Sequence, residues 1–63
     1  MNVLVIGGGG REHAIITALA KSKKVDKLYA APGNGGISKY AECFNVKATD
    51  IDGMVKLAKE LAV

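Results

Sequence analysis

The sequence has 63 residues, with nine Lys and Arg against six Asp and Glu, and a single cysteine. A chain of this length forms at most one small domain with a thin core, and a lone cysteine excludes an internal disulfide framework. No basic leader and no run of about 18 apolar residues is present, so we expect a soluble cytoplasmic protein that does not interact with a membrane.

The excess positive charge is concentrated where the first helix is expected to end. Cations at that position offset the helix dipole and solvate the surface. No aromatic side chain lies among them, so we interpret the segment as a solvated face and expect no nucleic-acid partner. The lysines concerned are Lys21, Lys23, Lys24 and Lys27.

The first expected element is a buried strand that runs directly into a glycine loop. Residues 3–6 are all branched aliphatics, and this continuous apolar run is typical of a strand covered on both faces in a parallel sheet. Four glycines follow at 7–10. Bare amides at a helix start, together with the positive end of the helix dipole, favour an anion such as phosphate. A tight turn without a ligand is the alternative, but one or two glycines would satisfy it.

A helix is expected over residues 12–21, ending near Ser22, and a second strand over residues 28–31. A strand, a helix and a strand of these lengths form a right-handed βαβ unit, in which the two strands are parallel. The residues expected on the buried face of the helix are Ala14, Ile15, Ala18 and Leu19.

A second run of turn formers, Pro-Gly-Asn-Gly-Gly at 32–36, follows the second strand. It lies at the same sheet edge as the first glycine loop, and open parallel sheets bind ligands outside the carboxyl ends of their strands. We therefore expect both loops to touch one ligand. An ordinary mobile loop is the alternative.

The remaining residues predict a short third strand over 43–46, followed by a second helix. The aromatic side chains of Tyr40 and Phe44 are expected to pack on the core. Thr49 is the expected cap of that helix, with Asp52 as its acidic partner. The chain is thus expected to be an α/β domain: a partial Rossmann-like parallel sheet with a βαβ crossover, about three strands and two main helices. The apolar stripe expected on the second helix is Ile51, Met54, Val55, Ala58 and Leu61.

Other site types are less well supported. A dinucleotide fingerprint needs a third glycine, but Glu12 or His13 stands there, and no acid follows the second strand, so NAD or FAD binding is an alternative only. No nucleophile with a base and no set of metal ligands is evident. His13 is expected to pack or hydrogen-bond, and Cys43 to be buried and inert. Arg11 could reach a phosphate oxygen or lie exposed. A small interaction module with purely structural glycines is a further alternative.

The string Gly-Gly-Arg-Glu-His-Ala at 9–14, followed by Pro-Gly-Asn at 32–34, resembles the N-terminal domain of the phosphoribosylamine-glycine ligase family. The resemblance covers all 63 residues. One departure is Gly8, where a serine is more usual in the family. Glycine at that position keeps the backbone donors and loses one hydroxyl.

The resemblance implies a pre-ATP-grasp fold in an enzyme of the ATP-grasp superfamily, acting in purine biosynthesis. In that family ATP and Mg²⁺ (or Mn²⁺) activate glycine as an acyl phosphate, which the amine of phosphoribosylamine attacks. The ATP-grasp domains that hold ATP and the metal should follow this segment. Residues 1–63 would then be an N-terminal substrate-binding domain, inactive alone and without a cofactor, a metal or a catalytic residue of its own.

The resemblance also implies roles for residues in both glycine loops. The first group would bind or border the 5-phosphate, with the arginine nearby, and the second would shape the ribose pocket. The first group is Gly8, Gly9, Gly10 and Arg11, and the second is Pro32, Gly33 and Asn34.

Overall fold

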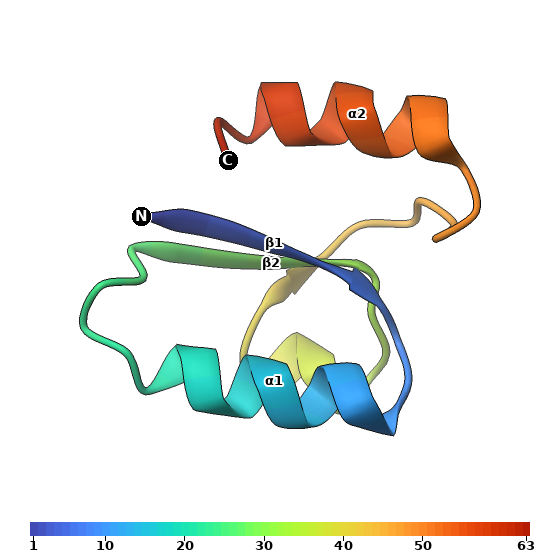
Figure 1. The fold of residues 1–63 in the computed structure, drawn as a ribbon. Coiled ribbons are helices and arrows are strands. Elements are labelled where there is room, and N and C mark those ends of the chain that lie inside the picture. Colours follow the sequence, from blue (N-terminus) through green and yellow to red (C-terminus); the bar gives the residue numbers. More distant parts are fainter.

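Three parallel strands form one sheet with helices on both of its faces (Figure 1). The computed structural model describes residues 1–63. The predicted α/β class, with three strands and two main helices, is confirmed. The elements in chain order are β1 (Asn2–Gly7), α1 (Gly10–Ala20), β2 (Lys27–Pro32), the 3-10 helix η1 (Ile37–Lys39), β3 (Glu42–Cys43) and α2 (Ile51–Glu60).

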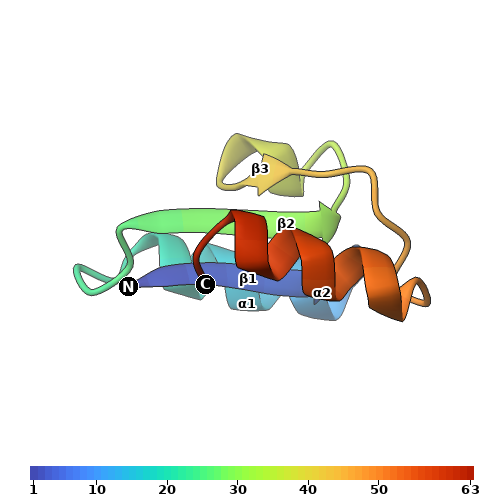
Figure 2. The same ribbon diagram turned by 90° about the horizontal axis from the view of Figure 1, so that it is seen from above.

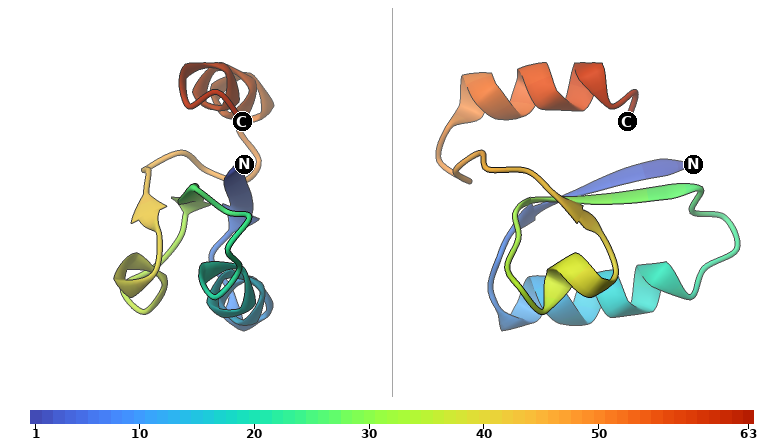
Figure 3. Two further views of the ribbon diagram at one scale, coloured as in Figure 1. Left: turned by 90° about the vertical axis from the view of Figure 1, so that its left-hand side faces the viewer. Right: turned by 180° about the vertical axis from the view of Figure 1, so that it is seen from behind.

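The layers are unequal on the two sides of the sheet. α1 and η1 lie on one face, and α2 lies alone on the other (Figures 1 and 3). Seen from above, α2 runs along β1 and β2, whereas β3 lies to one side (Figure 2). The chain ends come together at one end of the sheet, where the side-chain amide of Asn2 donates to the carbonyl oxygen of Leu61 at 3.5 Å (Figure 3).

The sheet has β2 at its centre, paired with β1 along its whole length and with β3 over only two residues. The β1–β2 register runs from Asn2 opposite Lys27 to Gly7 opposite Pro32. The third strand was predicted over 43–46, and this is wrong: β3 is Glu42–Cys43. The N–H of Phe44 still donates to Ala30 at 2.9 Å, but the N–H of Val46 then turns back to the carbonyl of Phe44, which takes the chain away from the sheet.

The prediction that β1 is covered on both faces is confirmed at Leu4 and Val5, which pack against two different apolar clusters, but is wrong for Ile6, which is exposed. The half-buried Val5 packs against the cluster beneath α1 and η1, which consists of Ile16, Ala30, Ile37 and Ala41. Its neighbour Leu4 packs against the cluster beneath α2, which contains Ala31. Side chains alternate across a strand, so a sheet with helices on both faces needs apolar residues at consecutive positions.

The predicted buried face of α1 is wrong for three of its four residues. Ala14, Ile15 and Ala18 are exposed, Leu19 is half-buried, and Ile16 is the fully buried residue. Apolar residues occur around most of this helix, so their spacing did not select one side. Contact with the small Ala30 of β2 and with Ile37 of η1 decides which side faces inward.

The predicted cap of α2 is one residue too early. Asp50, not Thr49, is the cap, and its Oδ1 accepts a hydrogen bond from the N–H of Gly53 at 3.0 Å. An aspartate there satisfies a backbone donor that the first helical turn leaves free. Met54 is buried as predicted, and Leu57, which was not predicted, is buried beside it.

The rest of the predicted α2 stripe is divided. Ala58 and Leu61 are half-buried, whereas Ile51 and Val55 are exposed.

Of the two aromatics expected in the core, Phe44 is half-buried, with its ring centroid 5.8 Å from that of Tyr29. Tyr40 is exposed, and its placement in the core was wrong.

The start of β1 is tied to the loop before β2 by an ion pair. The Met1 ammonium donates to the carboxylate of Asp26, and this hydrogen bond, with the charge attraction, holds the pKa of Asp26 below its ordinary value. A carboxylate whose pKa is lower in the folded state stabilises the fold above its unfolded pKa, and this contribution is lost as the pH falls through the folded pKa. Both groups are largely exposed, so the effect is small.

Candidate functional site

The two glycine-rich loops meet at the carboxyl ends of β1 and β2. The N–H of Gly33 donates to the carbonyl oxygen of Gly7 at 3.2 Å, which extends the β1–β2 pairing by one bond beyond the strands. The side-chain Nδ2 of Asn34 donates to the carbonyl oxygen of Gly8 at 2.5 Å. The predicted juxtaposition of the two loops is therefore confirmed.

Two of the glycines are needed because the loops approach so closely. A Cβ added to Gly8 would lie 2.6 Å from the carbonyl oxygen of Gly33. Gly33 has a φ of 68°, a conformation that residues with a Cβ rarely adopt, and a Cβ there would collide with the Cys43 thiol. At this separation of the loops, neither residue has room for a Cβ unless its neighbours shift.

The first loop leaves backbone donors free at the start of α1. Gly9 caps the helix with extended backbone and no side-chain hydrogen bond, and no hydrogen bond from the N–H of Gly8 or Gly9 is present. The N–H of His13 is bonded to the carbonyl oxygen of Gly9, so the three helical amides before it have no partner one turn back. Such donors, at the positive end of a helix, suit an anion.

Glu12 shapes this loop, although sequence reasoning did not select it as a site residue. A Cβ on Gly7 would lie 2.7 Å from Glu12 Oε1, and one on Gly9 would lie 3.1 Å from Oε2, so the carboxylate folds back over the loop. It places negative charge beside the free amides. The available signal was the preference for an acidic residue in the first helical turn, especially three positions after the cap.

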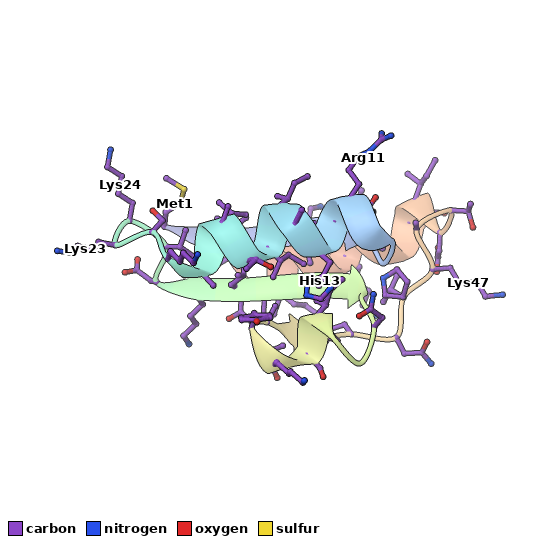
Figure 4. The ribbon with its side chains drawn as sticks, turned by 90° about the horizontal axis from the view of Figure 1, so that it is seen from below. Met1, Arg11, His13, Lys23, Lys24 and Lys47 are labelled. Carbon is purple, nitrogen blue, oxygen red and sulfur yellow. The ribbon has the colours of Figure 1, made fainter.

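Arg11 and His13 lie on different sides of α1. Arg11 is exposed and extends away from the helix, whereas His13 is directed toward the second loop (Figure 4). The His13 ring centroid is 6.0 Å from that of Tyr40, and a Cβ on Gly36 would lie 3.0 Å from its Cε1. The predicted packing role of His13 is therefore confirmed. The side chain of Arg11 does not contact the loops in this structure.

Cys43 borders the second loop from below. It is half-buried rather than fully buried, and its sulfur lies 3.9 Å from the carbonyl oxygen of Asn34 and 3.8 Å from that of Ala41. These are long, weak contacts of a thiol that fills space.

Outside the two loops, the structure was compared with the expectations for metal, nucleic-acid and membrane binding. No three His, Cys, Asp or Glu side chains come together as a metal-binding group. The lysines at 21–27 are all exposed, as predicted, and Lys23 and Lys24 lie at the end of the molecule opposite Arg11 (Figure 4). The structure contains no helix with the length and apolar character needed to cross a bilayer.

Comparison with known proteins identifies the family. Residues 1–63 match the family described as phosphoribosylglycinamide synthetase, N domain. The chain belongs to this family. The family match covers the entire chain, and the similarity to a whole relative covers 95% of it. The family membership therefore does not rest on the glycine loop alone.

Several relatives named phosphoribosylamine–glycine ligase are about half identical to the chain. The protein from Caldanaerobacter subterraneus subsp. tengcongensis is 52% identical over 58 residues, covering 92% of this chain and 14% of the relative. That from Halalkalibacterium halodurans is 53% identical over 60 residues, with 95% and 14% covered. That from Xylella fastidiosa strain Temecula1 is 48% identical, with 100% and 15% covered. The chain therefore spans about a seventh of the length of these relatives.

Proposed function

We propose that residues 1–63 are the N-terminal substrate-binding domain of a phosphoribosylamine-glycine ligase, and that they bind the phosphoribosylamine side of its substrates. The whole enzyme would join glycine to phosphoribosylamine at the expense of ATP, in purine biosynthesis in the cytoplasm. The family membership and the names of the relatives support this reaction.

The observation that carries the proposal is the joined pair of loops at one sheet edge. Free amides at the start of α1 offer donors for a 5-phosphate, and the second loop lies within hydrogen-bond distance of the first. One sugar phosphate could therefore contact both. In this proposal Gly8, Gly9, Gly10 and Arg11 bind or border the phosphate. The residues that shape the ribose pocket are Pro32, Gly33 and Asn34.

ATP, Mg²⁺ and glycine are proposed to bind to ATP-grasp domains elsewhere in the whole enzyme. The chain has no gathered group of metal-ligating side chains, and its glycine loop does not have the Walker pattern. In this division, the N-terminal domain holds and orients phosphoribosylamine so that its amine can attack an acyl phosphate formed at the other domains. The 63 residues alone would not catalyse ligation.

Ribose 5-phosphate, a stable stand-in for phosphoribosylamine, tests the binding proposal. Titrated into the isotope-labelled chain, it should shift the amide signals of residues 8–13 and of residues 33–35 together, and more weakly as salt rises. Shifts confined to the lysines at 21–27 would contradict the proposal, because they would indicate a response to diffuse positive charge only.

The variant Gly9→Val should abolish these shifts. Gly9 has a φ of −85°, and the only atom near its missing Cβ is the mobile end of Glu12, so valine is compatible with the fold. Its side chain would block close approach of a phosphate to the backbone. An unchanged melting temperature would separate this effect from unfolding. Unchanged binding would place the ligand elsewhere.

A further inference from the structure

The side chain of Asn34 makes two hydrogen bonds, one to each of two separate parts of the protein. Its Nδ2 donates to the carbonyl oxygen of Gly8 at 2.5 Å, and its Oδ1 accepts from the N–H of Ile37 at 2.9 Å. Its own carbonyl oxygen accepts from the N–H of Ser38 at 2.9 Å. Asn34 thus connects the first glycine loop, 26 residues earlier in the chain, to the start of η1.

The orientation of this amide is fixed by its partners. A backbone carbonyl only accepts, and a backbone N–H only donates, so Nδ2 must face Gly8 and Oδ1 must face Ile37. Rotating the amide by half a turn would place two acceptors together and two donors together. The side chain is therefore held between two parts of the protein by both of its polar atoms.

We propose that Asn34 is a positioning residue, which fixes the first glycine loop against the second, rather than a residue that contacts the sugar. This inference rests on the proposed function for its ligand and reassigns one residue within it. By holding the carbonyl of Gly8, Asn34 sets the direction of the next peptide units, whose amides begin α1. Loss of the bond would leave the loop attached by the Gly7–Gly33 bond and by packing alone.

The variant Asn34→Ser separates the two side-chain bonds without changing charge. A serine hydroxyl can accept from the N–H three residues on, as it does at helix caps, but it is too short to reach Gly8. Asn45→Ser is the matched control, because Asn45 is exposed and its side chain makes no hydrogen bond within the protein.

Two probes, inorganic phosphate and ribose 5-phosphate, are titrated into the full chain and both variants. A positioning role predicts that Asn34→Ser weakens both probes by the same factor, roughly three- to tenfold, as expected for loss of one hydrogen bond. Asn45→Ser should match the wild type. Retained phosphate affinity with weakened ribose 5-phosphate affinity would overturn the proposal in favour of a direct sugar contact. Unchanged affinity for both probes would also overturn it.

Failure of the proposed function looks different, since the wild-type chain would then bind neither probe at this edge. The positioning role of Asn34 can still be tested on the chain without any ligand. Asn34→Ser should shift the amide signals of residues 8–10 and speed their hydrogen exchange, and unchanged signals there would overturn it.

One further measurement uses the wild-type chain alone, so a variant that fails to fold cannot affect it. A scalar coupling across the hydrogen bond should join Asn34 Nδ2 to the carbonyl carbon of Gly8. Its absence in a sample that shows the corresponding couplings between β1 and β2 would overturn the assignment.

Discussion

Glu12 gives the first glycine loop an internal negative charge. Its carboxylate lies over Gly7 and Gly9, beside amides that a phosphate would use. Carboxylates near a helix N-terminus interact favourably with the helix dipole. The Glu12 carboxylate therefore offsets part of the positive potential that would attract an external anion. A bound phosphate and this carboxylate would repel each other unless the side chain turns away.

The variant Glu12→Gln should therefore bind inorganic phosphate more tightly. Removing one like charge near a helix start corresponds to about 0.3 to 1 kcal/mol, or roughly two- to fivefold in affinity. Titration calorimetry at low salt measures this, with Glu60→Gln on the exposed side of α2 as the control. Weaker binding by Glu12→Gln would show instead that the carboxylate assists the ligand.

Gly8 sets how closely the loops can approach. A Cβ at this position would meet the backbone oxygen of Gly33 at 2.6 Å, so the variant Gly8→Ser should lower the free energy of unfolding by about 1 to 3 kcal/mol. Gly10→Ser is the control, because a Cβ on Gly10 would have no atom within 4 Å. Equal stability of the two variants in urea unfolding would mean that the loops can separate without cost.

At the scale of elements, the sequence predicted strands and loops better than helix faces. The continuous apolar run at residues 3–6 predicted a strand covered on both faces, which holds at Leu4 and Val5. The two glycine runs predicted turns after the first and second strands. Ile15 and Ile16 are adjacent on α1, and only the small Ala30 and the following η1 determine that Ile16 faces inward. That information is tertiary, so helical periodicity could not supply it.

The contact between the loops was predictable in outline and not in detail. Parallel strands put the two loops at one edge, which the chain order alone indicates. Neither the hydrogen bond from Asn34 to Gly8 nor the folded-back position of Glu12 follows from spacing, because each depends on the path that glycine backbone takes through positive φ at Gly7 and Gly33.

The cap of α2 gives a prediction at the same scale. Asp50→Ala should lower the free energy of unfolding by about 1 kcal/mol, since it removes the acceptor for the N–H of Gly53. Thr49→Ala should change it by less than about 0.5 kcal/mol, as is usual for exposed positions without such a bond. Thermal unfolding of the two variants compares them, and a larger loss for Thr49→Ala would restore the cap predicted from the sequence.

For the whole molecule, the outer edge of β1 is an exposed feature with a consequence for association. This strand pairs only with β2, and its Ile6 is 51% exposed. A free strand edge with apolar neighbours tends to pair with another chain. We expect the 63-residue chain to self-associate as its concentration rises.

The variant Ile6→Lys should shift this association to higher concentration, because a lysine beside a strand edge opposes pairing. Ile15→Lys is the control: Ile15 is 47% exposed but belongs to α1 rather than to the edge strand. Sedimentation velocity measures both. An equal effect of the two lysines would assign the association to general apolar exposure, and a wild-type chain that stays monomeric at millimolar concentration would remove the prediction.

α2 lies across the sheet from α1 and η1, and this placement determines toward which edge of the sheet the chain runs after α2 (Figures 1 and 3). Crossovers between parallel strands are right-handed, so a helix on the opposite face carries the chain back the other way. A strand that followed α2 in a longer chain would therefore join the free edge of β1 and turn it from an edge strand into an interior one. The strand order would then reverse beside β1, and the glycine loop would open at a topological switch point, where neighbouring connections diverge and leave room for a ligand.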